Sequence, residues 1–167
     1  RLFQSSVRTA ERFAILNETS SHISALDPEE VYVAVHKAAE RLMPLDSFVI
    51  TLLDIERNEI DAVYLSDRGR RLPGERVPFG QGMSSQVIQS SKPLLVTSLE
   101  QANKLDSVQA GEEDQETQSV VAVPMILGGR SLGMLSAQSY QPAVYTEEDV
   151  QILGTLANQA IVAIQNG

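Results

Sequence analysis

The chain has 167 residues, a formal net charge of −9, 43% hydrophobic residues, and neither cysteine nor tryptophan. This length and apolar content suit one domain with a substantial core, and no run approaches the roughly 18 consecutive apolar residues of a membrane span. The charge argues against nucleic-acid binding, and the missing cysteine excludes disulfides, thiolate metal sites and thiol catalysis.

The first stretch, up to about residue 26, is predicted to be a helix because its apolar residues recur every three or four positions. They follow two stripes, Phe3, Val7, Ala10 and Ala14 on one, and Phe13, Leu16 and Ile23 on the other. Two stripes on one helix indicate two neighbours, namely its own domain and a partner helix. Because the sequence begins at Arg1 rather than methionine and lacks the apolar stretch of a signal peptide, we expect a segment of a longer protein. Residues 1–26 are then a connector and dimerisation helix, and residues 27–167 are the domain.

Asp27 opens a second helix, with Pro28 in its first turn and Glu30 at the capping-box position, and Pro44 ends it. Strands are predicted at residues 48–54, 59–65 and 94–97, because apolar residues alternate there between bounding turn residues. Residues 66–78 are predicted to be a loop, and Gly80-Gln81-Gly82 opens a short helix. The acidic residues 98–118 are predicted to form a short helix followed by a mobile loop.

A hairpin at residues 119–140 is predicted to be the centre of the sheet, with Gly128-Gly129 as its turn. A two-residue loop pairs Leu127 with Arg130, Met125 with Leu132, Val123 with Met134 and Val121 with Ser136; on the opposite face it pairs Ile126 with Ser131, Pro124 with Gly133, Ala122 with Leu135 and Val120 with Ala137. In this register the face packed under helices carries Ala122, Leu135 and Ala137, and the more polar face carries Ser119, Ser136 and Gln138.

The last helix is capped by Thr146 and begins with the acidic residues 147–149, which suit its positive end. A stripe at alternating spacings of three and four is typical of a coiled-coil contact, and it comprises Val150, Leu153, Ala157, Ala160 and Ile164. Leu156, Ile161 and Ala163 widen the apolar surface toward the domain. A simple core helix is the alternative interpretation.

In this order of elements, four fragments resemble a GAF domain over about residues 27–166. They are Pro78-Phe79-Gly80-Gln81-Gly82-Met83, Lys92-Pro93-Leu94, the stretch from Ser119 to Ser139 with Val123-Pro124 and Gly133-Met134-Leu135, and Tyr145-Thr146-Glu147-Glu148-Asp149. The resemblance implies an α+β fold of the GAF type (profilin-like and related to PAS domains). Such a fold has a central antiparallel six-stranded sheet, N- and C-terminal helices on one face, and a loop-covered pocket on the other. It also implies a cytoplasmic sensor in a longer signal-transduction protein, for example a bacterial histidine kinase of a two-component system or a cyclic-dinucleotide enzyme.

The pocket implied by this architecture predicts a set of ligand-binding residues, because small hydroxyls and an amide in an apolar wall suit a small polar ligand. The set is Thr51, Leu65, Met83, Ser84, Thr117, Ser119, Ser136 and Gln138. The ordinary interpretation is strand residues around a collapsed or water-filled cavity. A homodimer is expected through Phe3, Val7, Ala10 and Ala14 together with Val150, Leu153, Ala157, Ala160 and Ile164.

Several functional branches of the family are disfavoured, because the chain lacks the residues that those branches require. Ser139-Tyr140 replaces the Asn-Lys pair of the cyclic-nucleotide branch, so Asp149 lacks its lysine partner. Without cysteine the chain cannot attach a bilin covalently or act as the family's methionine-sulfoxide-reducing enzymes do. No metal is expected, and His22 and His36 lie on predicted helices, so a haem or metal role is not expected for either.

Other functions remain as alternatives at this point. Arg68, Arg70, Arg71 and Arg76 form either a solvated loop or a site for an anionic ligand or the acidic surface of a partner. No nucleophile with an activating base stands out, so we expect no enzyme activity. Beyond an unidentified small molecule, the expected partners are a second copy and a covalently linked output domain, with no nucleic acid and no membrane contact. The alternative function is a ligand-free dimerising spacer.

Overall fold

The computed structural model describes residues 2–104 and 116–166; most of the loop predicted within residues 98–118 lies outside them. The helices are α1 (Leu2–Ile23), α2 (Pro28–Leu42), α3 (Gly82–Ser90), α4 (Leu99–Asn103) and α5 (Glu147–Asn166). The strands are β1 (Ser47–Asp54), β2 (Glu59–Asp67), β3 (Arg70–Leu72), β4 (Arg76–Pro78), β5 (Leu94–Val96), β6 (Ser119–Leu127) and β7 (Arg130–Ser139). None of the described helices is long and apolar enough to cross a bilayer.

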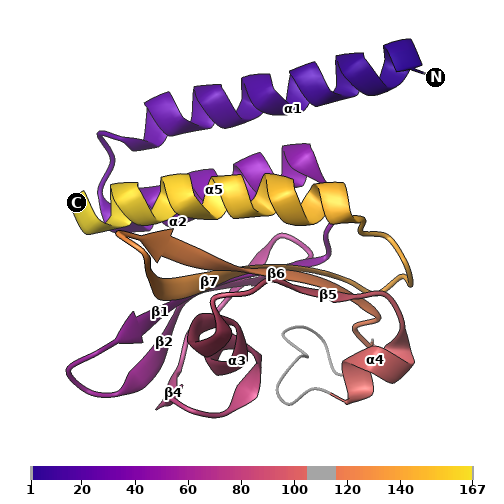
Figure 1. Cartoon of the computed structure of the whole chain (residues 1–167). Coiled ribbons are helices and arrows are strands. Elements are labelled where there is room, and N and C mark those ends of the chain that lie inside the picture. Colours follow the sequence, from indigo (N-terminus) through magenta and orange to yellow (C-terminus); the bar gives the residue numbers. More distant parts are fainter. Residues whose placement is uncertain (1, 105–115, 167) are drawn as a thin grey trace.

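The sheet confirms the predicted α+β fold with an antiparallel sheet. Its main path has the order β3-β2-β1-β7-β6-β5, and β4 pairs with β2 beside this path. The predicted loop at residues 66–78 therefore contributes the two short strands β3 and β4, which lie alongside the long strand β2. Figure 1 shows α2 and α5 on one face of this sheet and α3 and α4 on the other.

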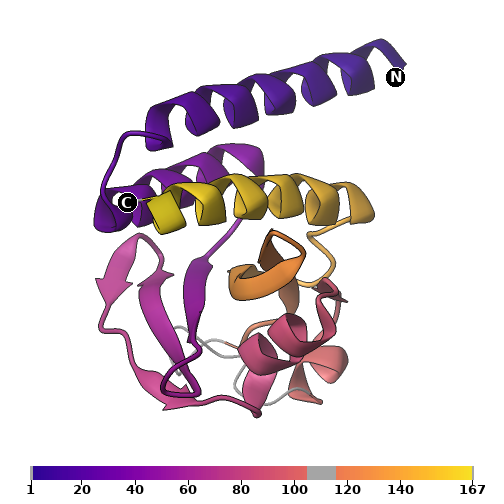
Figure 2. The same ribbon diagram turned by 60° about the vertical axis from the view of Figure 1, so that its left-hand side comes forward.

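Helix α1 forms a further layer, stacked on α2 and α5 rather than on the sheet, and both ribbon views agree on this (Figures 1 and 2). On the inner side of α1 Leu16 and Ile23 are buried, as predicted for the second stripe. On the other stripe Val7, Ala10 and Ala14 are exposed, and the side chain of Phe3 lies outside the described part of the chain. Phe13 was predicted to lie on the buried side but is 55% exposed.

The start of α2 carries the predicted capping box. The Asp27 carboxylate accepts from the backbone N–H of Glu30 at 3.0 Å, and the Glu30 carboxylate accepts from the backbone N–H of Asp27 at 3.4 Å. At α5 the backbone N–H of Thr146 donates to Asp149 Oδ2 at 2.9 Å. Both caps satisfy N–H groups that a helix end leaves without a partner.

The hairpin differs from its predicted register beyond the turn. Leu127 pairs with Arg130 and Ile126 with Ser131 as predicted, but Met125 pairs with Gly133, which leaves Leu132 as an extra residue. This bulge shifts every later pair by one residue, so the side chains of β6 lie on the opposite faces of the sheet from those predicted. Leu135 and Ala137 face the helices as predicted, whereas Ala122 lies on the opposite face with Met134, and Val121 and Val123 take its place under the helices.

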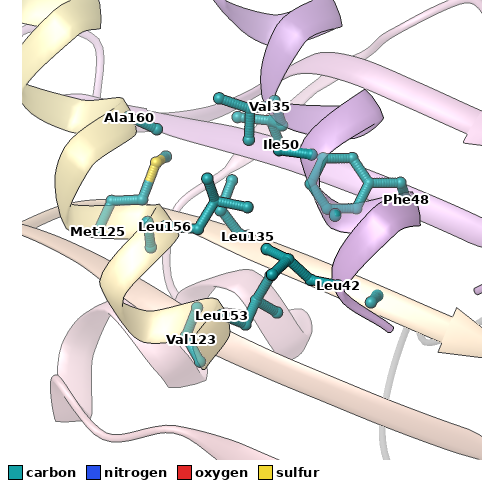
Figure 3. Close-up of a cluster of buried hydrophobic side chains, with 14 of the residues drawn as sticks. Val35, Leu42, Phe48, Ile50, Val123, Met125, Leu135, Leu153, Leu156 and Ala160 are labelled. Carbon is teal, nitrogen blue, oxygen red and sulfur yellow. The ribbon is translucent and has the colours of Figure 1, made fainter. Parts of the chain in front are cut away.

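Helix α5 also differs from the prediction. The proposed coiled-coil stripe is part of the domain's own core: Leu153, Ala157 and Ala160 are 0% exposed, and Val150 and Ile164 are buried with them. Figure 3 shows Ala160 and Leu153 beside Val35, Leu135 and other core side chains. The three residues predicted to widen the apolar surface toward the domain are buried too, namely Leu156, Ile161 and Ala163. The simple core helix is therefore the correct interpretation of α5.

Candidate functional site

A cavity of about 340 Å³ lies on the sheet face opposite α2 and α5. Its floor comes from β1, β2 and β7, and the first turn of α3 closes one side. Along β1 and β7 alternate residues point into it, namely Val49, Thr51, Met134 and Gln138, because successive strand side chains face opposite sides of a sheet. Its rim is formed by the exposed residues Glu75, Val77 and Gln81.

Two buried polar atoms of the floor have no hydrogen-bond partner among the described residues. They are Thr51 Oγ1 and Gln138 Oε1, on side chains that are 3% and 1% exposed. The other end of the Gln138 amide is engaged, since Nε2 donates to Ser136 Oγ at 3.2 Å. A buried polar group without a partner costs about 1–3 kcal/mol. These two atoms therefore favour any molecule that brings them hydrogen-bond partners.

The first turn of α3 adds donors to the same cavity. Gly82, Met83 and Ser84 line it, and Gln81 at the N-cap makes no side-chain capping hydrogen bond. The leading N–H groups of a helix have no partner within the helix. Gly82 has φ of +87°, which glycine adopts without strain, so the chain can turn sharply from the rim into the helix.

Charge around the cavity is sparse. Glu75 is the only ionisable side chain among the described lining residues, and it lies at the exposed rim. The end of a helix favours an anion by about 0.3–1 kcal/mol. This is less than the roughly 1–3 kcal/mol lost when the buried Gln138 Oε1 faces another acceptor. The cavity is thus poorly suited to an anionic ligand.

Five of the eight predicted ligand-binding residues line this cavity: Thr51, Leu65, Met83, Ser84 and Gln138. Ser136 lies on the same face of β7 but is fully buried, with its hydroxyl accepting from Gln138, and Thr117 is buried just before β6. Ser119 lies on the opposite, helix-packed side, because of the bulge at Leu132. Its hydroxyl donates to the Gln141 carbonyl at 2.7 Å.

A second hollow, of about 430 Å³, runs between α1 and α2. Its lining includes both signs of charge, and Arg41 pairs with Glu18 at 3.4 Å between exposed side chains. Exposed pairs of this kind are satisfied by water as readily as by a ligand. The cavity on the sheet is therefore the better candidate site.

Comparison with known proteins identifies the family. The sequence profile of the GAF domain family matches residues 25–165. The chain belongs to the GAF domain family. A search of curated protein sequences found no match.

Solved structures share the GAF fold with this chain. A GAF domain from a phosphoenolpyruvate-protein phosphotransferase of Coxiella burnetii is 18% identical, with a TM-score of 0.75 over 93% of each chain. A free methionine-R-sulfoxide reductase of Neisseria meningitidis is 20% identical, with a TM-score of 0.69 over 93% of this chain and 89% of the other. A methyl-accepting chemotaxis protein fragment is 18% identical, with a TM-score of 0.71 over 89% and 95%. The fold thus occurs in signalling proteins and in enzymes.

The arginines of residues 68–76 are not among the residues that line the cavity of this GAF domain. Arg68 lies 5.0 Å from the ring centroid of Tyr140, and Arg71 lies 4.1 Å from that of Tyr64 while binding Glu29 at 2.7 Å. Arg70 is exposed on β3. Arg76 binds three carboxylates, those of Asp54 and Asp61 at 3.0 Å and that of Glu59 at 3.4 Å. The structure therefore does not bring these side chains together as an anion site.

Both histidines also lie outside the cavity. His22 is on α1, and His36 is buried on α2, where its ring stacks on Phe48. A hydrogen bond of 2.5 Å joins His36 Nδ1 to Tyr64 Oη. Burial lowers the pKa of His36, with Glu40 opposing and Arg71 adding to this effect. In the folded domain the imidazole is therefore held toward its neutral form.

Asp149 has a partner that sequence reasoning missed. In place of the family lysine, Arg12 of α1 donates to Asp149 Oδ1 at 2.9 Å and approaches Glu148 at 3.3 Å. Nearby, Tyr145 Oη donates to the Pro44 carbonyl at 2.7 Å, and burial raises the pKa of this phenol, so it remains a donor. The signal for the pair was present in the sequence, because Arg12 precedes the buried Leu16 by four residues.

Proposed function

We propose that this GAF domain is a sensory module that binds a small uncharged molecule in the sheet cavity and regulates an output domain of a longer signal-transduction protein. The observation that carries the proposal is the pair of buried polar atoms, Thr51 Oγ1 and Gln138 Oε1, which line the cavity and have no hydrogen-bond partner in the part of the chain that the structure describes. Buried polar groups in proteins nearly always have partners. A ligand bound in the cavity would supply such partners, as ordered water does in other proteins.

The strands that hold the cavity also hold the helices. On β7, Met134 and Gln138 face the cavity, while the intervening Leu135 and Ala137 pack in the core with α2 and α5. On β1, Thr51 faces the cavity while Ile50 faces the helices. A movement of either strand on ligand binding would therefore displace side chains that pack against α5. A ligand can shift the helices only if it binds their two arrangements with different affinity.

The terminal helices are proposed to pass this change on. Arg12 connects α1 to the first turn of α5 through Asp149, so a displacement of α5 would be communicated to α1. The fold neighbours in a chemotaxis protein and a phosphotransferase support a role in signalling. We propose an output of the histidine kinase or cyclic-dinucleotide type on the same chain.

We propose binding rather than catalysis. Ser84 is a hydroxyl of the cavity, but a serine nucleophile needs an adjacent base. The two histidines lie on α1 and α2, on the far side of the sheet. The chain also has no cysteine to serve as a nucleophile.

A homodimer through α1 completes the proposal. Since the α5 stripe is buried within the domain, the free apolar surface for a second copy is the outer side of α1. It comprises Val7, Ala10, Phe13 and Ala14, with Val7 and Phe13 exposed at 40% and 55%. Small residues at positions 10 and 14 would let the α1 helices of two copies approach closely.

A thermal-shift screen of uncharged aromatic metabolites, with nucleotides and amino acids as charged comparisons, tests the proposal, because a ligand that binds only the folded state raises the melting temperature. The screen is repeated on Ala62→Leu, which places a larger side chain at the cavity wall. We expect at least one compound to stabilise the wild type and to lose this effect in the variant. If no compound does so, a ligand-free spacer is the better interpretation.

A further inference from the structure

The geometry points to a carboxamide or lactam on an apolar body as the chemical class that this cavity takes. This inference rests on the proposed function and extends it, because it names what the ligand must present. It follows from three features of the cavity: its unpaired polar atoms, its open helix end and its lack of cations.

The unpaired atoms set the polar edge of the ligand. Gln138 Oε1 accepts hydrogen bonds only, so it needs an N–H or O–H donor. Thr51 Oγ1 can both donate and accept. The first turn of α3 lines the same cavity without a side-chain cap, and the leading N–H groups of a helix need an acceptor from outside the helix. A group that carries both a donor and a carbonyl can serve both needs.

The remaining surface sets the body of the ligand. Val49, Ile60, Leu65 and Met134 line the cavity with hydrocarbon and a thioether. Such walls favour an apolar ring or chain, with the polar groups fixing its orientation.

The charge excludes the anionic alternatives. No described lining residue is a lysine, arginine or histidine, and Glu75 contributes negative charge at the rim. Arg76, the nearest arginine in sequence, is bound by three carboxylates. A carboxylate or phosphate would place acceptors against Gln138 Oε1 with no cation to compensate. Phosphorylated nucleotides are therefore outside the predicted class.

Three probes of nearly the same shape separate these features. Benzamide offers both a donor and a carbonyl, acetophenone replaces the amide NH2 by a methyl group, and benzoate replaces it by a charged oxygen. Affinities are measured by calorimetry, and binding at the cavity is established from the methyl NMR signal of Met83. We expect benzamide to bind at least about tenfold more tightly than either of the others. This is the usual difference in affinity when one buried polar group of the protein gains a hydrogen-bond partner from one ligand and not from another.

Two variants and a matched control assign the effect to the cavity. Gln138→Leu is expected to remove the preference for benzamide over acetophenone. Thr51→Val keeps the side-chain shape and is expected to weaken benzamide severalfold, so the test does not depend on one variant. Gln159→Leu is the control, since Gln159 Oε1 is also buried with no partner among residues 2–104 and 116–166 but lies on α5 beneath α1. It is expected to leave the affinities of all three probes unchanged.

Each outcome decides the inference. A benzamide preference that Gln138→Leu abolishes supports it. Equal or tighter binding of acetophenone or benzoate at the Met83 signal overturns the ligand class and leaves the sensory function standing. Failure of all three probes, while the thermal-shift screen yields another ligand, also overturns the class alone. If neither experiment finds a ligand at the cavity, the proposed function falls with it.

Discussion

Arg12 Nη2 and Asp149 Oδ1 lie 2.9 Å apart, on side chains that are each only 5% exposed, and they join the middle of α1 to the first turn of α5. Asp149 is also part of the cap of α5, since its Oδ2 accepts from the backbone N–H of Thr146. The pair therefore makes the packing of the outermost helix depend on the helix that covers the sheet. Figure 1 shows that the first turns of α1 extend past the start of α5.

Arg12→Met tests this anchor. The substitution keeps an apolar side chain but leaves Asp149 buried without its cation, and breaking a buried pair costs about 3–5 kcal/mol. We expect a lower free energy of unfolding in urea and faster proteolysis within α1. Arg8→Met is the control, because Arg8 is exposed on the same helix. Equal behaviour of the two variants would show that the pair contributes nothing to the packing of α1.

Dimerisation is tested by a charge on the outer side of α1. Ala14→Glu would place an unpaired carboxylate between two α1 helices, so we expect a wild-type dimer to become a folded monomer in analytical ultracentrifugation. Gln86→Glu adds the same charge on the exposed side of α3 and should leave the dimer intact.

Ala160→Glu separates the two helix surfaces. Ala160 is 0% exposed within the domain core, so a glutamate there should unfold the domain rather than dissociate a dimer. Circular dichroism distinguishes these results. A wild type that is monomeric at tens of micromolar, a concentration typical of weak association, would rule out the α1 dimer.

Two glycines predict opposite effects on stability. A Cβ at Gly133 would lie 2.4 Å from the Thr51 carbonyl oxygen and 2.5 Å from Met125 Cε, so Gly133→Ala forces the backbone of β1 or β7 to move. We expect it to lose about 1–3 kcal/mol in urea unfolding, as overpacked cores do. Gly154, within α5, has open space at its Cβ, and Gly154→Ala should gain about 0.5–1 kcal/mol. A neutral Gly133→Ala would contradict the close contact between β7 and β1.

His36 predicts how stability changes with pH. Because burial lowers its pKa in the folded state, the unfolded chain binds a proton more readily. The free energy of unfolding should therefore fall as the pH drops below about 6.5, the ordinary value for histidine. In His36→Leu this part of the decline should disappear, whereas the exposed His22→Gln variant should keep it. Urea unfolding at pH 7.5, 6.5 and 5.5 measures the difference, and parallel curves for wild type and His36→Leu would refute it.

Much of the fold could be predicted from the sequence, because its signals are local. The capping residues Asp27 and Glu30 fix the start of α2, and alternation places Thr51 and Gln138 on one face of the sheet. The bulge at Leu132 could not be predicted, since nothing in the residues next to the turn requires an extra position. It is the reason that Ser119 and Ala122 were assigned to the wrong faces.

The helix contacts were harder to predict, because a stripe at heptad spacing suits a core as well as a coiled coil. Leu153 and Ala160 therefore gave a misleading signal, and only the stacking of α1 above α5 shows which surface is free. Glu75 and Gln81 at the cavity rim were missed because they lie in a stretch assigned to a loop and a helix start, with no periodicity to place them.

The methionines allow the most direct test of the sensory site. Met83 and Met134 line the cavity, whereas Met43 and Met125 are buried in the core on the helix side of the sheet. The chain has four methionines, so a methyl-labelled sample reports on both sides of the sheet in one spectrum. Titration with benzamide is predicted to shift the methyl signals of Met83 and Met134 first and furthest, in a saturable manner that Ala62→Leu suppresses. Shifts confined to Met43 and Met125, or a saturable response that Ala62→Leu leaves unchanged, would contradict the assignment of this cavity as the ligand site.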